Sequence, residues 1–85
     1  MVQRGHMPQV RIRYFAVLRE KRGCSEEDIN CPTGTTIGEL YDQLFPRSAG
    51  PRIRAGYAIN FKQVREDTIL ENGDEVAFLP PIGGG

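Results

Sequence analysis

Hydrophobic and polar residues alternate near the N-terminal end of the chain, and this alternation predicts strands. Between residues 10 and 18 every second position is apolar while Arg11 and Arg13 are polar, a period of two that is typical of a half-buried strand. Residues 20–23 have the composition of a turn, and residues 28–31 predict a weaker second strand that faces the first.

A different period follows and predicts the main helix. Thr36 precedes Glu39 by three residues, the spacing of a capping box, in which the hydroxyl and the carboxylate each satisfy a free backbone amide. Apolar residues then recur at helical spacing along one stripe: Ile37, Leu40, Tyr41, Leu44 and Phe45. Gly38 weakens this helix without ending it. Pro46 ends it, because proline excludes the helical conformation at the residue before it.

More strands are predicted after the helix. Residues 57–61 alternate again, and residues 63–64 predict a short edge strand. The dipeptide Asn72-Gly73 is a strong turn signal, and residues 75–79 after it predict a last strand.

The order of these elements is strand, strand, helix, strand, short strand, strand. A single helix must bury its apolar stripe on one face of the sheet. The chain is therefore predicted to adopt an α+β fold of the β-grasp (ubiquitin-like) type, with a mixed sheet of four to five strands packed on one main helix. Residues 1–7 are expected to be a disordered leader or a cloning remnant, residues 8–81 the β-grasp domain and residues 82–85 a flexible glycine tail.

Side-chain alternation places apolar residues on the face of the sheet that the helix leaves uncovered. If Ile12 and Tyr14 face the helix, then Phe15 and Val17 face away from it. By the same alternation Leu79 faces away in the last strand. Single exposed apolar residues are normal on any surface. However, Leu79 directly precedes the tail, which favours a docking patch for a partner protein that includes Phe15 and Leu79.

The tail combines a stiff base with a tip that has no side chains. Pro80 and Pro81 favour an extended conformation, and residues 83–85 are glycines, which allow another backbone to approach most closely. This pattern predicts that the tip enters a narrow channel of a partner enzyme and that the carboxylate of Gly85 reacts there. Because a carboxylate is a poor electrophile, ATP would have to activate it as an acyl-adenylate. A frayed end without function is the alternative.

Composition excludes several classes of function. The chain has 85 residues, with 11 basic and 11 acidic side chains, so it lacks the basic excess of a nucleic-acid-binding domain. No apolar run approaches the ~20 residues of a membrane span, and the expected compartment is the cytoplasm. Two cysteines and one histidine are too few for a closed zinc site. Cys24 and Cys31 are expected to be free thiols in a reducing compartment, with a disulfide as the alternative.

Three segments carry motifs of one known family: residues 14–20 (YFAVLRE), residues 36–40 (TIGEL) and residues 72–85 (NGDEVAFLPPIGGG). On these motifs residues 8–85 resemble the small subunit of molybdopterin synthase, the MoaD-type sulfur carriers. The glycine at position 83 departs from the family pattern, which usually has a small polar residue there.

The resemblance implies a defined chemistry. An E1-like adenylating enzyme would use ATP to adenylate the Gly85 carboxylate, and sulfur from a persulfide, supplied indirectly by a donor of the cysteine desulfurase or rhodanese type, would make it a thiocarboxylate. The large synthase subunit would then receive the threading tail, Pro80, Pro81, Ile82, Gly83 and Gly84. There the thiocarboxylate would give sulfur to a pyranopterin precursor of the molybdenum cofactor. Phe15 and Leu79 match the partner-binding surface of the family. The chain itself would bind no cofactor and supply no acid, base or nucleophile.

Two other functions remain open. A sulfur carrier for thiamin or for transfer-RNA thiolation would share the fold and the final Gly-Gly, but such carriers generally lack the Pro-Pro before it. A β-grasp interaction module with an inert tail would still bind its partner after deletion of Gly84 and Gly85.

Overall fold

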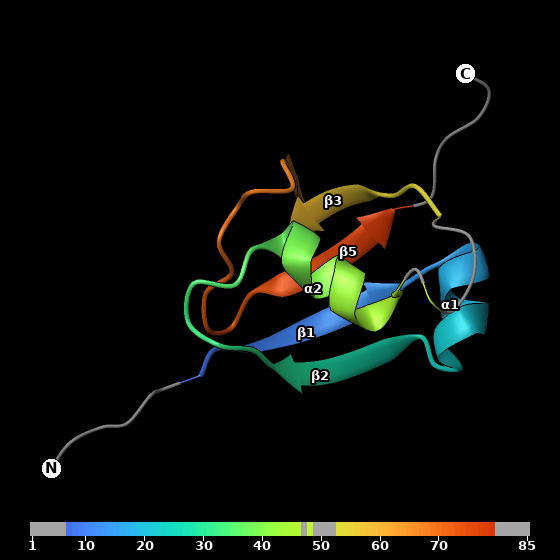
Figure 1. The fold of residues 1–85 in the computed structure, drawn as a ribbon, viewed down its shortest axis with the longest axis horizontal. Coiled ribbons are helices and arrows are strands. Elements are labelled where there is room, and N and C mark those ends of the chain that lie inside the picture. The colour runs from blue at the N-terminus through green and yellow to red at the C-terminus, as the bar shows by residue number, and fades with distance from the viewer. Residues whose placement is uncertain (1–6, 47, 49–52, 80–85) are drawn as a thin grey trace, which may run out of the picture.

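The computed structural model describes residues 7–46, 48 and 53–79, and within them a five-stranded sheet packs against one of two helices (Figure 1). In chain order the elements are β1 (Gln9–Tyr14), α1 (Ala16–Arg22), β2 (Glu26–Asn30), α2 (Ile37–Leu44), β3 (Gly56–Ile59), β4 (Lys62–Val64) and β5 (Glu75–Leu79). The strand order is β2-β1-β5-β3-β4. β1 and β5 run parallel, whereas the other neighbours are antiparallel. The predicted α+β fold with a mixed sheet is confirmed.

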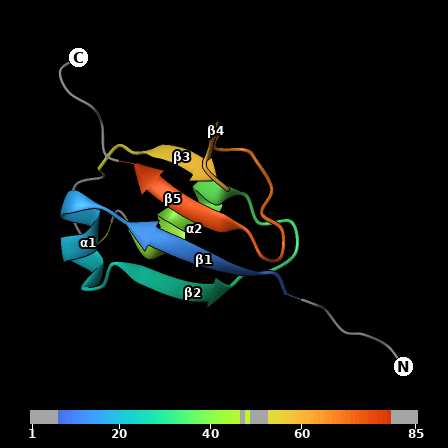
Figure 2. The same ribbon diagram turned by 180° about the vertical axis from the view of Figure 1, so that it is seen from behind.

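Helix α2 lies across one face of the sheet (Figure 1). Seen from behind, the opposite face is covered by no helix of the described residues, and α1 lies at the end where β1 and β5 finish (Figure 2). This is the β-grasp arrangement predicted from the order of the elements. Because β1 and β5 are parallel and Tyr14 pairs with Phe78, the two strands finish at the same end of the sheet.

The space between α2 and the sheet is filled by apolar side chains with aromatic rings at the centre. The ring of Phe78 contacts four others, with centroid distances between 5.0 and 6.4 Å: those of Tyr14, Tyr41, Phe45 and Tyr57. Such pairs contribute about 0.5–1.5 kcal/mol each beyond the burial of their area. Val76 and Phe78 are fully buried, as the alternation in the last strand predicts.

Helix α2 begins and ends as predicted. The backbone N–H of Glu39 donates to Oγ1 of Thr36 at 3.1 Å, and the N–H of Thr36 donates to Oε1 of Glu39 at 3.0 Å, so the capping box is complete. The helix ends at Leu44, two residues before Pro46. Three residues of the predicted stripe are fully buried: Ile37, Leu40 and Tyr41.

The strand predicted over residues 10–18 is too long, because β1 ends at Tyr14. Ala16 has a positive φ of 52° and begins α1. Leu18 is fully buried, but from the helix and not from the strand. Val17, predicted to face away on the sheet, lies on α1 and is 40% exposed. A helix this short has too few residues for its period to be distinguished from that of a strand.

The turn predicted at residues 20–23 is wrong for most of its length. Helix α1 continues to Arg22, and Gly23 ends it in the left-handed conformation with a φ of 79°. The N–H of Gly23 donates to the carbonyl of Arg19 at 2.9 Å. Glycine is preferred at this position because it has no Cβ to clash in that conformation. The glycine therefore marks a helix end and not a hairpin turn.

Two other strands differ from their predicted bounds. β2 begins at Glu26 and so earlier than predicted. β3 ends at Ile59, and the next two residues, Asn60 and Phe61, form a turn with φ values of 52° and 68°. The side-chain oxygen of Asn60 accepts a hydrogen bond from the N–H of Glu75 at 3.0 Å and so ties this turn to β5. Phe61, predicted to belong to the strand, is 85% exposed. The predictions of β4 and β5 are confirmed.

Candidate functional site

The predicted tail follows directly on a central strand of the sheet. Leu79 is the last residue of β5, and β5 is paired with β1 on one side and β3 on the other. The tail residues named from the sequence lie outside the described residues: Pro80, Pro81, Ile82, Gly83, Gly84 and Gly85. The structure therefore defines where the tail is attached, at the end of a strand held by two neighbours.

Phe15 and Leu79 lie at the same end of the uncovered face. Tyr14 is paired with Phe78 across β1 and β5, and Phe15 keeps an extended backbone, with φ −125° and ψ 151°. Since side chains alternate along an extended chain, Phe15 points away from the side on which Tyr14 is buried. Phe15 is 41% exposed, and Leu79 is half-buried. Strand pairing thus brings together the two residues predicted to contact a partner.

The uncovered side of the sheet, here called the open face, has an apolar part and a charged part. Its outward residues include Arg11, Arg13, Phe15, Glu26, Asp28, Ala58, Glu75, Ala77 and Leu79. Over β3 and β5 the side chains are small: Ala58 pairs with Ala77, and Gly56 pairs with Leu79. The small side chains leave Leu79 and Phe15 as the large apolar groups of this face.

Ion pairs cross the charged part, over β2, β1 and β5. Arg11 Nε lies 3.0 Å from Oδ1 of Asp28. Arg13 lies between two carboxylates, with Nε 2.7 Å from Oε2 of Glu75 and Nη2 3.8 Å from Oε2 of Glu26. Exposed pairs of this kind contribute only about 0–1 kcal/mol each. They therefore set the pattern of charge on the open face more than the stability of the sheet.

A hydrogen-bonded clamp holds the end of α1 against the sheet. Arg22 Nη2 donates to both carboxylate oxygens of Glu27, at 2.8 and 2.9 Å, and the hydroxyl of buried Tyr14 donates to Oε1 of Glu27 at 2.9 Å. The hydrogen bonds from Arg22 lower the pKa of Glu27, with a further contribution from Tyr14. Burial raises the pKa of Tyr14, and the hydrogen bond to Glu27 raises it further. Because Phe15 precedes α1, this clamp helps to set the position of Phe15. Sequence reasoning did not find the clamp, since its partners lie on three different elements.

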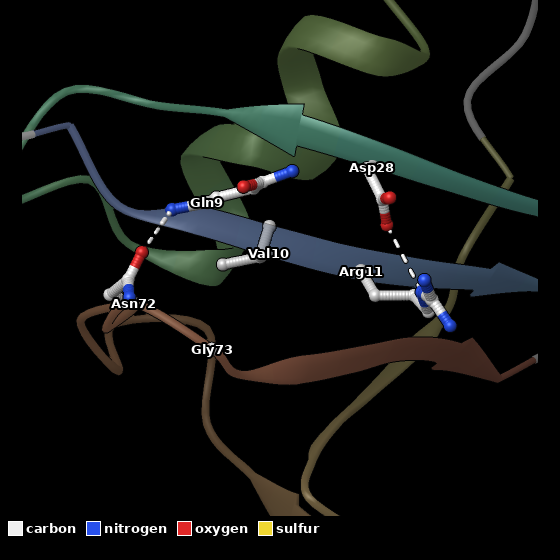
Figure 3. Close-up of a pocket in the computed structure, with 6 residues that line it drawn as sticks. All are labelled: Gln9, Val10, Arg11, Asp28, Asn72 and Gly73. Carbon is white, nitrogen blue, oxygen red and sulfur yellow. Dashed lines mark hydrogen bonds and ion pairs between the residues drawn. The ribbon is translucent and has the colours of Figure 1, made fainter.

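At the opposite end of the sheet a shallow depression of ≈ 280 Å³ lies between the start of β1 and the Asn72-Gly73 turn (Figure 3). The N–H of Gln9 donates to Oδ1 of Asn72 at 2.9 Å, and Arg11 pairs with Asp28 beside it. These contacts hold the turn and the strands, and they leave no group of buried donors that selects a ligand. The depression lies at the start of β1 and β5, away from Leu79 at the end of β5, and is not part of the candidate site.

Three further features of the described residues concern thiols, metal ligands and helix length. Cys24 and Cys31 are free thiols, as predicted, and burial raises the pKa of Cys31. Within residues 7–46, 48 and 53–79 no group of three or more His, Cys, Asp or Glu side chains is placed to hold a metal ion. No helix in the described part of the chain is long and apolar enough to cross a membrane.

Comparison with known proteins identifies the family. The model of the ThiS family matches residues 12–85, from β1 through the tail. The chain belongs to the ThiS family. This ThiS-family chain is 38% identical over 85 residues to the molybdopterin synthase sulfur carrier subunit of Mycobacterium tuberculosis, which covers 93% of the chain and 100% of that relative. The resemblance to the small subunit of molybdopterin synthase, predicted from the sequence, is confirmed.

Solved structures agree with this assignment. A putative molybdopterin converting factor subunit 1 from Pyrococcus furiosus superposes with a TM-score of 0.73 at 28% identity, covering 88% of this chain and 99% of that chain. A complex of subunits 1 and 2 of molybdopterin-converting factor from Helicobacter pylori matches with a TM-score of 0.55 at 21% identity, covering 91% and 99%. At that identity the second match shows the shared fold alone.

Proposed function

We propose that this ThiS-family chain is the sulfur carrier subunit of a molybdopterin synthase, with the carboxylate of Gly85 as the group that carries sulfur. The observation that carries the proposal is the attachment of the tail to β5, beside Phe15 and Leu79 on the open face. A partner that covers this face is positioned to receive the tail. The similarity to molybdopterin synthase sulfur carrier subunits supports the assignment of the pathway.

The tail is long enough to reach deep into a partner. Residues 80–85, if extended, span about 20 Å at roughly 3.4 Å per residue. Residues 83–85 are glycines, so the last part of the tail needs only the width of a backbone. The reacting carboxylate of Gly85 can therefore lie well inside a partner whose surface contacts Leu79.

The chemistry divides between the carrier and its partners. In the activating enzyme, which is expected to be E1-like, the Gly85 carboxylate attacks the α-phosphorus of ATP and releases pyrophosphate. The terminal sulfur of a persulfide, supplied through a cysteine desulfurase or rhodanese type of donor, then displaces AMP from the acyl-adenylate. A thiol cleaves the acyl disulfide that results and leaves the thiocarboxylate. The carrier supplies the acyl group, and the partners supply the acids, bases and ATP.

In the second half of the cycle the thiocarboxylated carrier docks on the large subunit of the synthase. The thiocarboxylate sulfur bonds to a pyranopterin precursor, and water then hydrolyses the resulting thioester, which leaves the sulfur on the precursor and returns Gly85 to the carboxylate. Both partners are proposed to use the open face around Phe15 and Leu79, so they compete for the carrier. This cycle is proposed for the cytoplasm.

The proposal is tested by intact mass spectrometry after incubation with ATP, the activating enzyme and a sulfur source. The expected result is a gain of one sulfur minus one oxygen that maps to the C-terminal peptide. Mapping is required because oxidation of Met or Cys adds almost the same mass. A chain that lacks Gly84 and Gly85 is the control. An unmodified C-terminal peptide, under conditions that charge an established carrier, would overturn the proposal in favour of an interaction module with an inert tail.

The alternative pathways differ in the molecule that accepts sulfur. The thiocarboxylated carrier is therefore incubated in turn with the large synthase subunit and pyranopterin precursor, and with thiamin or transfer-RNA thiolation enzymes. Sulfur transfer is expected with the synthase alone, and transfer to another acceptor at a higher rate would reassign the pathway.

A further inference from the structure

The charged part of the open face contains an arginine whose hydrogen-bonding capacity this chain leaves unused. Arg13 Nε lies 2.7 Å from Oε2 of Glu75, and its Nη2 lies 3.8 Å from Oε2 of Glu26. The second distance is too long for a hydrogen bond. Oε2 of Glu75 is shielded from solvent yet accepts no hydrogen bond with good geometry from a described residue. The guanidinium has five N–H donors, so carboxylates on two sides hold Arg13 in place without satisfying it.

Arg13 lies at the boundary between the charged and apolar parts of the open face. It pairs with Ala77 across β1 and β5 and is two residues from Phe15. Its side chain is 44% exposed. A partner that covers Phe15 and Leu79 must therefore cover Arg13 as well. Burying unsatisfied guanidinium donors is unfavourable, so a stable complex needs an acceptor from the partner at this point.

We infer that Arg13 is a specificity-determining contact, which donates to a carboxylate on the large subunit of molybdopterin synthase when the two subunits assemble. The inference rests on the proposed function and identifies one chemical feature of the partner. A guanidinium binds a carboxylate through two parallel hydrogen bonds, a geometry that a lysine does not reproduce. Glu26 and Glu75 orient the guanidinium in the free carrier and reduce the conformational entropy lost on docking.

The large subunit is the occupant favoured here because the carrier and that subunit form one enzyme. Its interface must cover the open face during sulfur transfer, and a charge buried in that interface is unfavourable unless it is paired. A partner that lacks an acceptor at this point is disfavoured by the unpaired guanidinium. Rejection of wrong partners by this route is a common source of specificity.

Arg11 is a matched control on the same strand and the same face. It lies two residues before Arg13, and its Nε donates to Oδ1 of Asp28 at 3.0 Å. Its side chain is 57% exposed, and it borders the depression beside the Asn72-Gly73 turn (Figure 3). Arg11 thus has the same charge and a similar cross-strand pair, but lies farther from Phe15.

The experiment measures, by titration calorimetry, the affinity of the full-length carrier, with Gly85 as the free carboxylate, for the large subunit. Arg13→Ala is expected to weaken binding about 10- to 100-fold, the usual loss for a charged hydrogen-bonded contact. Arg13→Lys should recover only part of this loss. Arg11→Ala should change the affinity by less than about 3-fold, because exposed charges contribute little. Glu75→Gln keeps the Arg13 charge and removes only one of the carboxylates that orient it, so it should weaken binding by less than Arg13→Ala does.

Four results would overturn the inference. Arg13→Ala could bind like the wild type, or Arg11→Ala could weaken binding as much as Arg13→Ala does. Equal losses in Glu75→Gln and Arg13→Ala would show that the internal pair supports the sheet and nothing more. If Arg13→Ala lowered the affinity for the activating enzyme but not for the large subunit, Arg13 would contact the activating enzyme instead. Thermal unfolding of each variant identifies any loss that comes from misfolding, and Arg13→Lys retains the charge if Arg13→Ala does not fold.

Failure of the inference is distinguishable from failure of the proposed function. The calorimetric measurement needs no sulfur, and the mass-spectrometric measurement needs no large subunit. A carrier that is thiocarboxylated at Gly85 and binds the large subunit equally well with and without Arg13 retains its function and overturns the inference alone. A wild-type chain that does not bind the large subunit overturns both.

Discussion

The backbone N–H of Gly38 donates to the carbonyl oxygen of Glu66 at 2.9 Å, and a Cβ on residue 38 would lie 2.9 Å from that same oxygen. The preceding residue makes a similar contact, since the N–H of Ile37 donates to the carbonyl of Thr68 at 2.9 Å. Amides in the first turn of a helix have no partner within the helix. Here backbone carbonyls from the loop before β5 satisfy two of them, and glycine is the residue that permits the close approach.

Gly38→Ala is therefore expected to destabilise the protein although alanine is the better helix former. Helix propensity alone favours alanine by about 1 kcal/mol. A contact of Cβ with a backbone oxygen at 2.9 Å forces the loop to move, and overpacking of this kind costs about 1–3 kcal/mol. Chemical denaturation should show a lower free energy of unfolding. Gly56→Ala is the control, since a Cβ there would lie 3.9 Å from the nearest atom, in Leu79. Equal effects of the two substitutions would contradict this account.

Phe15→Asp should separate partner binding from stability. Phe15 is the N-cap of α1, and its side chain makes no capping hydrogen bond. Aspartate is a favourable N-cap, so the free energy of unfolding is expected to stay the same or rise by up to about 1 kcal/mol. Binding to the large subunit should fall by about 10-fold or more, because a charge replaces an apolar contact.

Phe61→Asp is the matched control for that substitution. Phe61 is 85% exposed and lies in the turn after β3, at the end of the sheet away from Leu79. Its replacement should leave affinity for the large subunit unchanged. If Phe15→Asp binds normally, or if Phe61→Asp binds as weakly as Phe15→Asp, then the docking patch is misplaced.

Glu27→Gln is expected to weaken the clamp between α1 and the sheet in a pH-dependent way. Hydrogen bonds from Arg22, followed by one from Tyr14, lower the pKa of Glu27 below its ordinary value of 4.5. A carboxylate whose pKa is lowered by folding stabilises the protein above its unfolded-state pKa, and this stabilisation is lost as the pH falls through the folded-state pKa. At neutral pH we expect a loss of about 1 kcal/mol in Glu27→Gln, discounted for partial exposure.

The measurement is denaturation of both proteins between neutral pH and pH values below 4.5. The difference between wild type and Glu27→Gln should shrink as the pH falls below that value. Glu26→Gln is the control, because its contact with Arg13 is 3.8 Å long and should contribute little at any pH. A difference for Glu27→Gln that does not vary with pH would remove the carboxylate from the explanation.

Extension of the chain beyond Gly85 by one tryptophan should abolish thiocarboxylation. The added side chain cannot enter a channel that fits only backbone, and the activated carboxyl group would no longer belong to glycine. Mass spectrometry after incubation with ATP and the activating enzyme provides the measurement. Extension by one glycine is the control for length. Adenylation of the tryptophan-extended chain at the wild-type rate would contradict the prediction of a narrow channel.

Local patterns in the sequence were sufficient for the elements whose signals are local. The capping box of Thr36 and Glu39, the turn at Asn72-Gly73 and the alternation in β5 each depend on residues within a few positions of one another. The β-grasp arrangement followed from the order of these elements, because one helix has one sheet face to cover. The motif that ends at Gly85 predicted the family in the same way, from consecutive residues.

Only the tertiary structure shows where β1 ends and why residue 38 is a glycine. The apolar spacing of Ala16 and Leu18 fits a strand as well as a short helix, and the choice depends on the core that Leu18 enters. Gly38 looks like a defect in the helix until the carbonyl of Glu66 is placed beside it. The position of Arg13 between two carboxylates likewise requires the pairing of β1 with β2 and β5. These features depend on contacts between residues distant in sequence, and such contacts are set by packing of the whole chain and not by local propensity.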